Sequence, residues 1–311
     1  MKREWALLAL FACIVAGVQA KNPSFITAQN LRDVLIQVSP FAILACGSAF
    51  VIVLGEIDIS IGSMAGLLAA VLGTAVSSSH WGWPLWTSVV LMTVLGGAIG
   101  LVNGVLVVFG RVPSIIVTLG MLTGLRGVTV VVLGGEWITD LPPGLRSFGT
   151  GTVAGAPVPV LVALAVCLLS WAIATQTPLG LRAFAVGGNQ HAAIVRGLNV
   201  KGIRVLAFVL MGLLTAVATL VSAPRLSVIE SGFGVQWELF VITCVVVGGV
   251  SIKGGKGTLT GVFLAVLILG MIRTALLFLK LGDSAVYWER AIQGALIVLA
   301  VLADFRGRRR E

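Results

Sequence analysis

Long apolar segments alternate with short polar turns along almost the whole chain. A helix needs about 20 apolar residues to cross the hydrocarbon core of a bilayer. On that measure the sequence predicts an all-α integral membrane protein with about ten transmembrane helices, and residues 1–311 form a single transmembrane domain. The predicted spans are 4–20, 34–54, 63–79, 85–109, 112–134, 157–175, 202–222, 238–251, 258–280 and 285–303. The third and the eighth are short, which predicts helices that are tilted, broken or only partly inserted.

Two carboxylates interrupt the apolar pattern between the second and the third span, at Glu56 and Asp58. A carboxylate at bilayer depth costs about 2.5–3.5 kcal/mol, so such a residue faces a cavity, a helix break or a membrane boundary. We predict a helix break at the cytoplasmic face, where Asp58 and Ser60 end one helix and cap the next.

The basic residues predict the orientation of the chain. With the N-terminus inside, thirteen of the 21 Lys and Arg residues fall on the cytoplasmic side and six on the outer side, while Arg126 and Arg273 lie within spans. The positive-inside rule therefore places both termini in the cytoplasm. An alternative concerns only the first span, because Met1–Ala20 also resembles a signal peptide. Its cleavage would start the mature chain outside and leave the remaining topology unchanged.

Composition supports a membrane protein and excludes several other classes. Hydrophobic residues make up 58% of the chain and charged residues 11%, whereas a soluble protein carries roughly a quarter charged residues. The net charge of +9 lies in short loops, which favours topology signals over a nucleic-acid surface. The four cysteines lie inside apolar segments and the two histidines lie apart, so we predict no metal site, no disulfide framework and no cofactor.

Two glycine-rich turns resemble each other. The segment 54–60 can be aligned with 247–253, and each follows a valine-rich run and precedes another span. Both fall at a cytoplasmic turn, so a duplication, if the match is not chance, would be parallel. The second turn continues as Gly254-Gly255-Lys256-Gly257 but lacks the first glycine and the final Ser or Thr of a Walker A sequence. We therefore predict no ATP site here.

The largest cytoplasmic loop, residues 175–204, predicts a short docking helix. Asn189 is a good N-cap and Gly197 a good helix stop, which leaves about two helical turns between them. Ala192 and Ala193 are small enough for close docking. So short a helix is unstable alone and needs a partner surface. The alternative is a loop that folds back onto its own membrane domain.

Four blocks of the sequence resemble ribose-type (monosaccharide) ABC transporter permeases. They are Gly55–Ser63, Val112–Gly120 followed by Arg126-Gly127, Gly187–Gly197 and Val247–Gly257. The similarity runs in order over nearly the whole chain. Glu56 departs from the usual Gly, and Val250 departs from the usual Thr.

The resemblance assigns candidate roles to these blocks. The signature turns comprise Gly55, Asp58, Ser60, Gly62, Ser63, Gly254, Gly255, Lys256 and Gly257. The ATPase-coupling segment comprises Gly188, Asn189, Ala192, Ala193 and Gly197. The loop Gly135–Pro142 looks more like the autoinducer-2 and rhamnose branches of the family than the ribose branch.

What the resemblance implies is a permease subunit of a binding-protein-dependent importer in the bacterial inner membrane. It would carry a monosaccharide or a related small polyol, work as a homodimer or heterodimer, and take its energy from a separate cytoplasmic ATPase. A periplasmic protein would deliver the sugar, and the chain itself would be no enzyme.

Two other function classes remain open on the residues alone. A proton-coupled secondary transporter would use Asp58 or Glu56 as its carrier, and a structural membrane scaffold would explain the spans but not the charges within them. Asn103, Arg126 and Arg273 are the polar residues best placed to line a transport path. Each would equally serve helix-to-helix hydrogen bonding or extend its polar end to the membrane interface.

Overall fold

The computed structural model describes residues 2–279 and 284–308. In that part of the chain the regular elements are helices, joined by turns and loops, together with one small β-hairpin. A helix lies at each of the ten predicted spans, with ends shifted by a few residues; the predicted end of the ninth span, at 280, and the C-terminal residues 309–311 lie outside the described residues. These helices are α1 (Lys2–Lys21), α2 (Ala28–Val53), α3 (Ile61–Val76), α4 (Leu85–Val108), α5 (Ser114–Leu133), α7 (Val158–Gln176), α10 (Val200–Ser222), α11 (Trp237–Val247), α12 (Leu259–Phe278) and α13 (Ser284–Arg308).

Six of these helices are long and apolar enough to cross a membrane, namely α2, α4, α5, α7, α10 and α12. The shorter apolar helices are α3, α11 and the second half of α1. The short third and eighth spans predicted from the sequence are thus confirmed as helices of 16 and 11 residues. The full count of ten membrane crossings stays a prediction.

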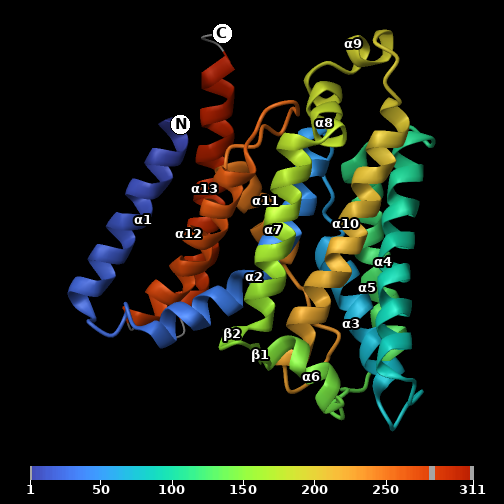
Figure 1. Cartoon of the computed structure of the whole chain (residues 1–311), viewed down its shortest axis with the longest axis vertical. Helices are drawn as coiled ribbons and strands as arrows, with labels where there is room; N and C mark the ends of the chain where they lie inside the picture. Colours follow the sequence, from blue (N-terminus) through green and yellow to red (C-terminus); the bar gives the residue numbers. More distant parts are fainter. Residues whose placement is uncertain (1, 280–283, 309–311) are drawn as a thin grey trace.

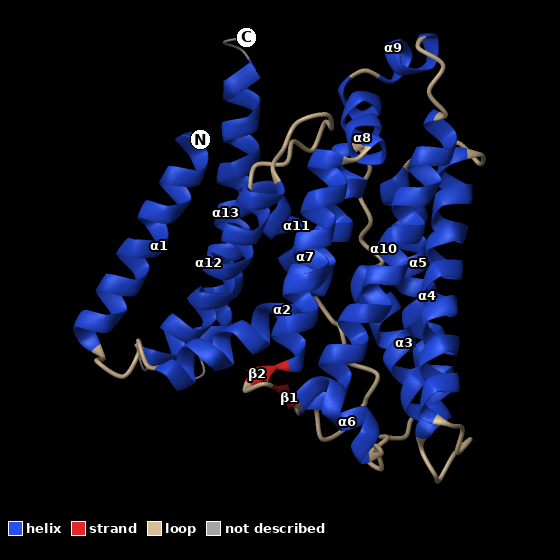
Figure 2. Ribbon diagram, viewed as in Figure 1, coloured by secondary structure: helices blue, strands red, loops and turns tan. Residues whose placement is uncertain are grey.

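Several short elements were not foreseen in the sequence. They are α6 (Pro143–Thr150), β1 (Thr152–Val153) paired antiparallel with β2 (Ala156–Pro157), α8 (Pro178–Gly188) and η1 (Ala223–Arg225), whereas α9 (Gln190–Val195) is the short helix predicted between Asn189 and Gly197. The loop predicted at 175–204 is therefore largely helical, because Thr177 caps α8 by accepting from the Gly180 N–H and Pro178 fits its first position. Figure 2 shows α8 and α9 at one end of the molecule and α6 with the hairpin at the other. We call these the α9 end and the α6 end.

The helices form two groups on either side of α2. In Figure 1, α3, α4, α5 and α10 lie on one side, while α1, α12 and α13 lie on the other, and both marked chain ends point toward the α9 end. The closest pair is α4 with α10, where Gly96, Gly100 and Gly104 face α10. A methyl group on Gly100 would overlap the Phe208 carbonyl, so these glycines let the two backbones approach as closely as packed membrane helices do.

The central helices are buried, whereas the outer ones expose apolar side chains. All 16 residues of α3 and most of the second half of α2 are buried. By contrast, Val94 of α4, Val131 of α5 and Leu169 of α7 are largely exposed. An apolar surface of this extent is stable when it faces lipid rather than water. The fold therefore places a dry helical core inside a ring of lipid-compatible helices.

The backbone departs from straight helix at one bend and two unwound stretches in this core. Pro40 lies within α2, and in Figure 1 that helix runs sideways at its start and then upward, as a proline bend allows. After α2 the chain is unwound over 54–60 before α3 begins, which confirms the predicted break. A second unwound stretch, 226–236, precedes α11. Irregular backbone of this kind is tolerated at membrane depth only where protein or water satisfies its polar groups.

Candidate functional site

Three turns that are far apart in sequence meet at the α9 end through their backbones. The Gly255 N–H donates to the Val53 carbonyl oxygen at 2.7 Å, and a methyl group on Gly187 would overlap that same oxygen. Gly254 and Gly255 have positive φ angles of +86° and +74°, a conformation that other residues resist. We call this contact among 53–55, 187–188 and 253–255 the glycine joint.

The glycine joint brings together one end of each of the two similar turns. A Cβ on Gly55, which has φ +79°, would lie 3.5 Å from the Lys253 carbonyl oxygen, so the start of segment 54–60 lies beside the end of segment 247–253. Each ends an apolar helix at the same end of the molecule. That shared position agrees with the predicted parallel arrangement, while the duplication itself stays a prediction.

The predicted glycine turn closes on itself before it reaches α12. The Ser251 N–H donates to the Lys256 carbonyl at 2.9 Å, and the Gly254 N–H donates to the Ser251 carbonyl at 2.9 Å. Gly257 has φ +156° and packs against Val250, while the Lys256 side chain is exposed. These two bonds close the turn on itself, while the Gly255 N–H ties it to the end of α2, as a tight structural turn requires of its backbone donors.

Asp58 is buried inside the helical bundle, and its place at the cytoplasmic face stays a prediction. Its side chain is 1% exposed, and Oδ1 accepts from the Ser60 N–H at 2.8 Å and from the Ser60 hydroxyl at 2.6 Å. Asn103 of α4 donates to Ser60 Oγ at 3.0 Å and to Asp58 Oδ2 at 3.4 Å. Asp58 thus organises the start of α3, whereas the Ser60 side chain makes no capping bond of its own.

The rest of the unwound segment is held by hydroxyl groups of α5. The Ile57 N–H donates to Ser114 Oγ at 3.1 Å, and the Ile59 N–H donates to Thr118 Oγ1 at 3.2 Å. Ser114 and Thr118 belong to the block Val112–Gly120, to which the sequence gave no role. Their spacing of four residues places them on one helix face, and that was the available signal.

Glu56 forms an ion pair with Arg204 of α10, and both side chains are mostly buried. Arg204 lies near the start of α10, the helix that follows α9, so the pair links the α2–α3 break to α10. A glycine, the usual family residue at position 56, could not make this contact. Glu56 is therefore a feature of this chain and not of the shared backbone geometry.

The coupling segment has the predicted cap and stop. Asn189 Oδ1 accepts from the Ala192 N–H at 2.9 Å, and Gly197 ends the segment at φ +77°. One part of the prediction is wrong: Ala193 is buried against its own chain and cannot dock on a partner, although Ala192 is exposed. The Ile194 and Val195 side chains stand out instead, at 57% and 74% exposed. Gly188 is exposed beside the glycine joint.

All three predicted path-lining residues have hydrogen-bond or ion-pair partners. Asn103 is fully buried in the Asp58 cluster. Arg126 donates from Nη1 to the carbonyls of Ser231 at 2.8 Å and Phe233 at 2.9 Å, which fixes the second unwound stretch. That stretch presses on α3 where Gly62 leaves room for the Gly234 carbonyl. The adjacent Ser63 hydroxyl is buried and has no hydrogen-bond partner.

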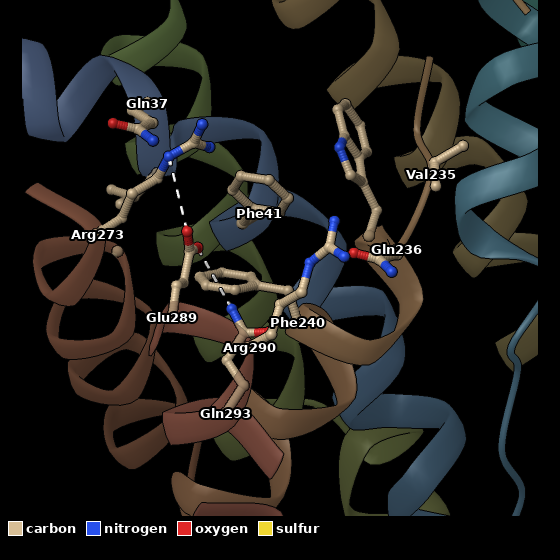
Figure 3. Close-up of a pocket in the computed structure, with 12 residues that line it drawn as sticks. Gln37, Phe41, Val235, Gln236, Phe240, Arg273, Glu289, Arg290 and Gln293 are labelled. Carbon is tan, nitrogen blue, oxygen red and sulfur yellow. Dashed lines mark hydrogen bonds and ion pairs between the residues drawn. The ribbon is translucent and has the colours of Figure 1, made fainter. Parts of the chain in front are cut away.

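Arg273 lines a cavity of about 230 Å³ between α2, α11, α12 and α13. Figure 3 shows its guanidinium group beside Glu289, with Nε 3.7 Å from Oε2, and Gln293 donates to the other Glu289 oxygen at 3.4 Å. We call this the amide cavity, because three of its lining residues are glutamines. Its lining residues are Gln37, Val38, Phe41, Val235, Gln236, Trp237, Phe240, Gly270, Arg273, Glu289, Arg290 and Gln293.

The amide cavity adjoins a larger, open cavity of about 780 Å³ that leads toward the α6 end. The two share Gln37, Phe41, Val235, Trp237 and Arg273. The sequence gave no sign of this site beyond Arg273, because its residues come from four helices and the unwound stretch before α11, with no common motif. The available signals were a lone glutamine in the middle of α2 and a glutamine just before α11.

No group of three or more His, Cys, Asp or Glu side chains among residues 2–279 and 284–308 is placed to hold a metal ion. The functional geometry of the described chain therefore consists of the glycine joint, the buried Asp58 cluster and the amide cavity. The first two connect helix breaks to the α9 end, and the third is accessible from the α6 end.

The chain was compared with known proteins. A family model described as "Branched-chain amino acid transport system / permease component" matches residues 30–301. Relatives include the ribose import permease protein RbsC of Haemophilus influenzae, 37% identical over 97% of this chain and 92% of the relative. The L-arabinose permease protein AraH of Azospirillum brasilense is 33% identical over 96% and 86%, and the autoinducer 2 permease protein LsrC of Enterobacter sp. is 35% identical over 97% and 85%. No solved structure gives a significant match.

Proposed function

The chain belongs to the family of branched-chain amino acid transport system permease components, and from that membership we propose that it is the membrane-spanning permease subunit of an ABC importer for a monosaccharide or related polyol. The observation that carries the proposal is similarity over nearly the full length to a permease named for ribose import and to a permease named for an L-arabinose ABC transporter, with a further relative, 31% identical, named for D-allose transport in Escherichia coli. In this proposal the chain hydrolyses no ATP itself and sits as a multi-pass protein in the bacterial inner membrane.

The proposed partners follow from the two ends of the molecule. A cytoplasmic ATPase subunit docks on α8 and α9, where Ile194 and Val195 expose apolar side chains in the largest loop of that end. The positive-inside rule supports the placement of this end, and with it both termini, in the cytoplasm. A periplasmic sugar-binding protein meets the α6 end, and a second permease subunit, identical or different, completes the transporter.

The glycine joint gives the proposed coupling a physical route. It joins α8, which leads into α9, to the end of α2 and to the α11–α12 turn by backbone contacts without intervening flexible side chains. A rigid contact of this kind transmits a displacement, because a close-packed interior does not deform continuously. Movement of α9 by a bound ATPase would therefore be passed to the unwound segment at Asp58.

The second candidate function, a proton-coupled transporter, is favoured by one observation: a carboxylate is buried inside the membrane domain at Asp58. The proposed role as an ATP-driven permease is tested in proteoliposomes that contain the chain with the ATPase and binding protein of the same system. We expect uptake of radiolabelled sugar that requires ATP inside and persists with a protonophore. Uptake without ATP that a protonophore abolishes would instead support the second candidate.

A further inference from the structure

The amide cavity presents groups of one chemical kind from separate elements. Gln37 comes from α2, Gln236 from the unwound stretch before α11 and Gln293 from α13, and all three line the same space (Figure 3). A carboxamide both donates and accepts hydrogen bonds. An aliphatic hydroxyl group does the same, so several amides around one cavity match a ligand that carries several hydroxyl groups.

The charges of the cavity are largely used within it. Arg273 and Gln293 both engage Glu289, so that carboxylate is not free to hold an ammonium group. Figure 3 shows Arg290 extending toward Gln236 at the opposite wall. An amino acid needs a free acidic partner as well as a basic one, because an unpaired buried charge is costly. The described lining residues therefore offer an amino acid no free carboxylate, while the three glutamines among them suit a ligand that carries hydroxyl groups.

One wall of the cavity is aromatic. The Phe41 ring lies 5.2 Å from the Trp237 ring and 4.6 Å from the Phe240 ring, centroid to centroid, and Trp237 also lies 4.9 Å from Phe233. Aromatic faces carry negative charge density. They attract the slightly positive C–H groups that one side of a sugar ring presents. Gln236 holds a φ of +67°, a conformation rare for a residue with a side chain.

The size of the cavity sets the size of the ligand. A volume of about 230 Å³ holds roughly eight waters at about 30 Å³ each and lies below the range of about 300–1,000 Å³ typical of drug-sized ligands. The adjoining open cavity gives access from the α6 end. A ligand the size of a monosaccharide fits such a site and can reach it from outside.

We propose that the amide cavity is a binding site of this chain for a neutral monosaccharide or polyol, with Gln37 and Gln293 as hydrogen-bonding residues and Phe41 and Trp237 as the stacking wall. The inference rests on the proposed function, since it names the contacts that the transported sugar makes inside the permease. It adds that the permease itself, and not only a delivery protein, recognises the substrate class.

The test uses the full chain in lipid nanodiscs without any partner, and saturation-transfer NMR with D-ribose, L-arabinose, D-allose and leucine as probes. We expect a saturable signal from at least one sugar and none from leucine. Gln37→Leu and Gln293→Leu should each raise the dissociation constant by about two- to ten-fold, the effect of losing one net hydrogen bond. Gln29→Leu is the matched control, because Gln29 lies exposed on the same helix as Gln37 and outside the cavity.

Three results would overturn the proposed site: a saturable signal from leucine but from no sugar, no saturable signal from any sugar, or sugar affinities in both cavity variants that equal the wild-type affinity. ATP-dependent uptake with all partners separates this result from the proposed function. If the wild type and both variants import sugar at equal rates, the importer function stands and the cavity site falls. If the wild type imports no sugar although the nanodisc signal is saturable and sensitive to both variants, the site stands and the importer function falls.

Discussion

The glycine joint and the amide cavity differ in the part of the residue that builds them. At the glycine joint the contacts are made by backbone atoms. Any side chain at Gly187 or Gly255 would overlap backbone atoms of a neighbouring segment. At the amide cavity the contacts are made by long side chains around an open volume. The first region therefore tolerates almost no substitution without loss of the fold, while the second can change its side chains and alter recognition alone.

The largest effect is expected from a methyl group in the joint. Gly187→Ala would place Cβ against the Val53 carbonyl, whereas Gly188→Ala, one residue further along α8, meets only the Gly255 Cα at 3.9 Å. Overpacking of this kind costs about 1–3 kcal/mol or more. We expect a clear fall in the melting temperature and yield of the Gly187 variant in detergent and little change in the Gly188 variant. Equal stability of the two would show that the joint is not closely packed.

The second effect concerns Asp58, which connects the joint to the core. Asp58→Leu removes the acceptor of the Ser60 N–H and hydroxyl and of the Asn103 amide, and each buried group left unpaired costs about 1–3 kcal/mol. Asp58→Asn keeps one accepting oxygen and should retain most expression and transport. Both are measured by yield and by ATP-driven uptake. A folded Asp58→Asn protein without transport would favour the proton-carrier mechanism.

The third prediction separates the proposed docking of the ATPase on α9 from the stability of the protein. Val195→Asp puts a charge on the most exposed apolar side chain of α9, and Val153→Asp is the matched control at the α6 end, where Val153 is 60% exposed. We expect the first to reduce sugar-stimulated ATPase activity about ten-fold or more, because central apolar contacts dominate an interface. Neither should change the melting temperature. Full stimulation in Val195→Asp would contradict docking at α9.

These two regions also mark how much the sequence could reveal. Gly55 and Gly254 stood out because a glycine that packs backbone against backbone cannot be replaced without penalty, and such positions form short motifs. The close-packed Gly187 did not stand out, since the sequence named its neighbour Gly188 instead. The break before α3 was visible because Glu56 and Asp58 interrupt an apolar run. The burial of Asp58 was not, since it depends on Asn103 of α4, 45 residues away.

The cavity, by contrast, could not be predicted. Gln37 is separated from Arg273 and Glu289 by most of the chain, and the three share no spacing, so only the packing of α2 against α12 and α13 brings them together. The same reason hid the hydrogen-bond partners of Asn103 and Arg126, which lie on other elements, while the path-lining role of these residues stays a prediction. Local patterns reveal helix breaks and close turns, whereas the residues that surround a cavity depend on tertiary arrangement.

The smallest effect is expected at Glu56, the charged side chain that this sequence adds beside the joint. If the joint is held mainly by backbone contacts, the Glu56–Arg204 pair contributes little, even though both side chains are mostly buried, because desolvation offsets most of the attraction between paired charges. A double-mutant cycle with Glu56→Gln and Arg204→Met measures the pair itself. We expect a coupling of about 1 kcal/mol in melting experiments. The exposed pair of His80 and Glu136, 3.7 Å apart at the α6 end, serves as the control and should give a value near zero. A coupling near zero at Glu56 would mean that the backbone contacts alone hold the joint together. A coupling as large as the Gly187→Ala effect would instead show that the Glu56 side chain holds the joint in this protein.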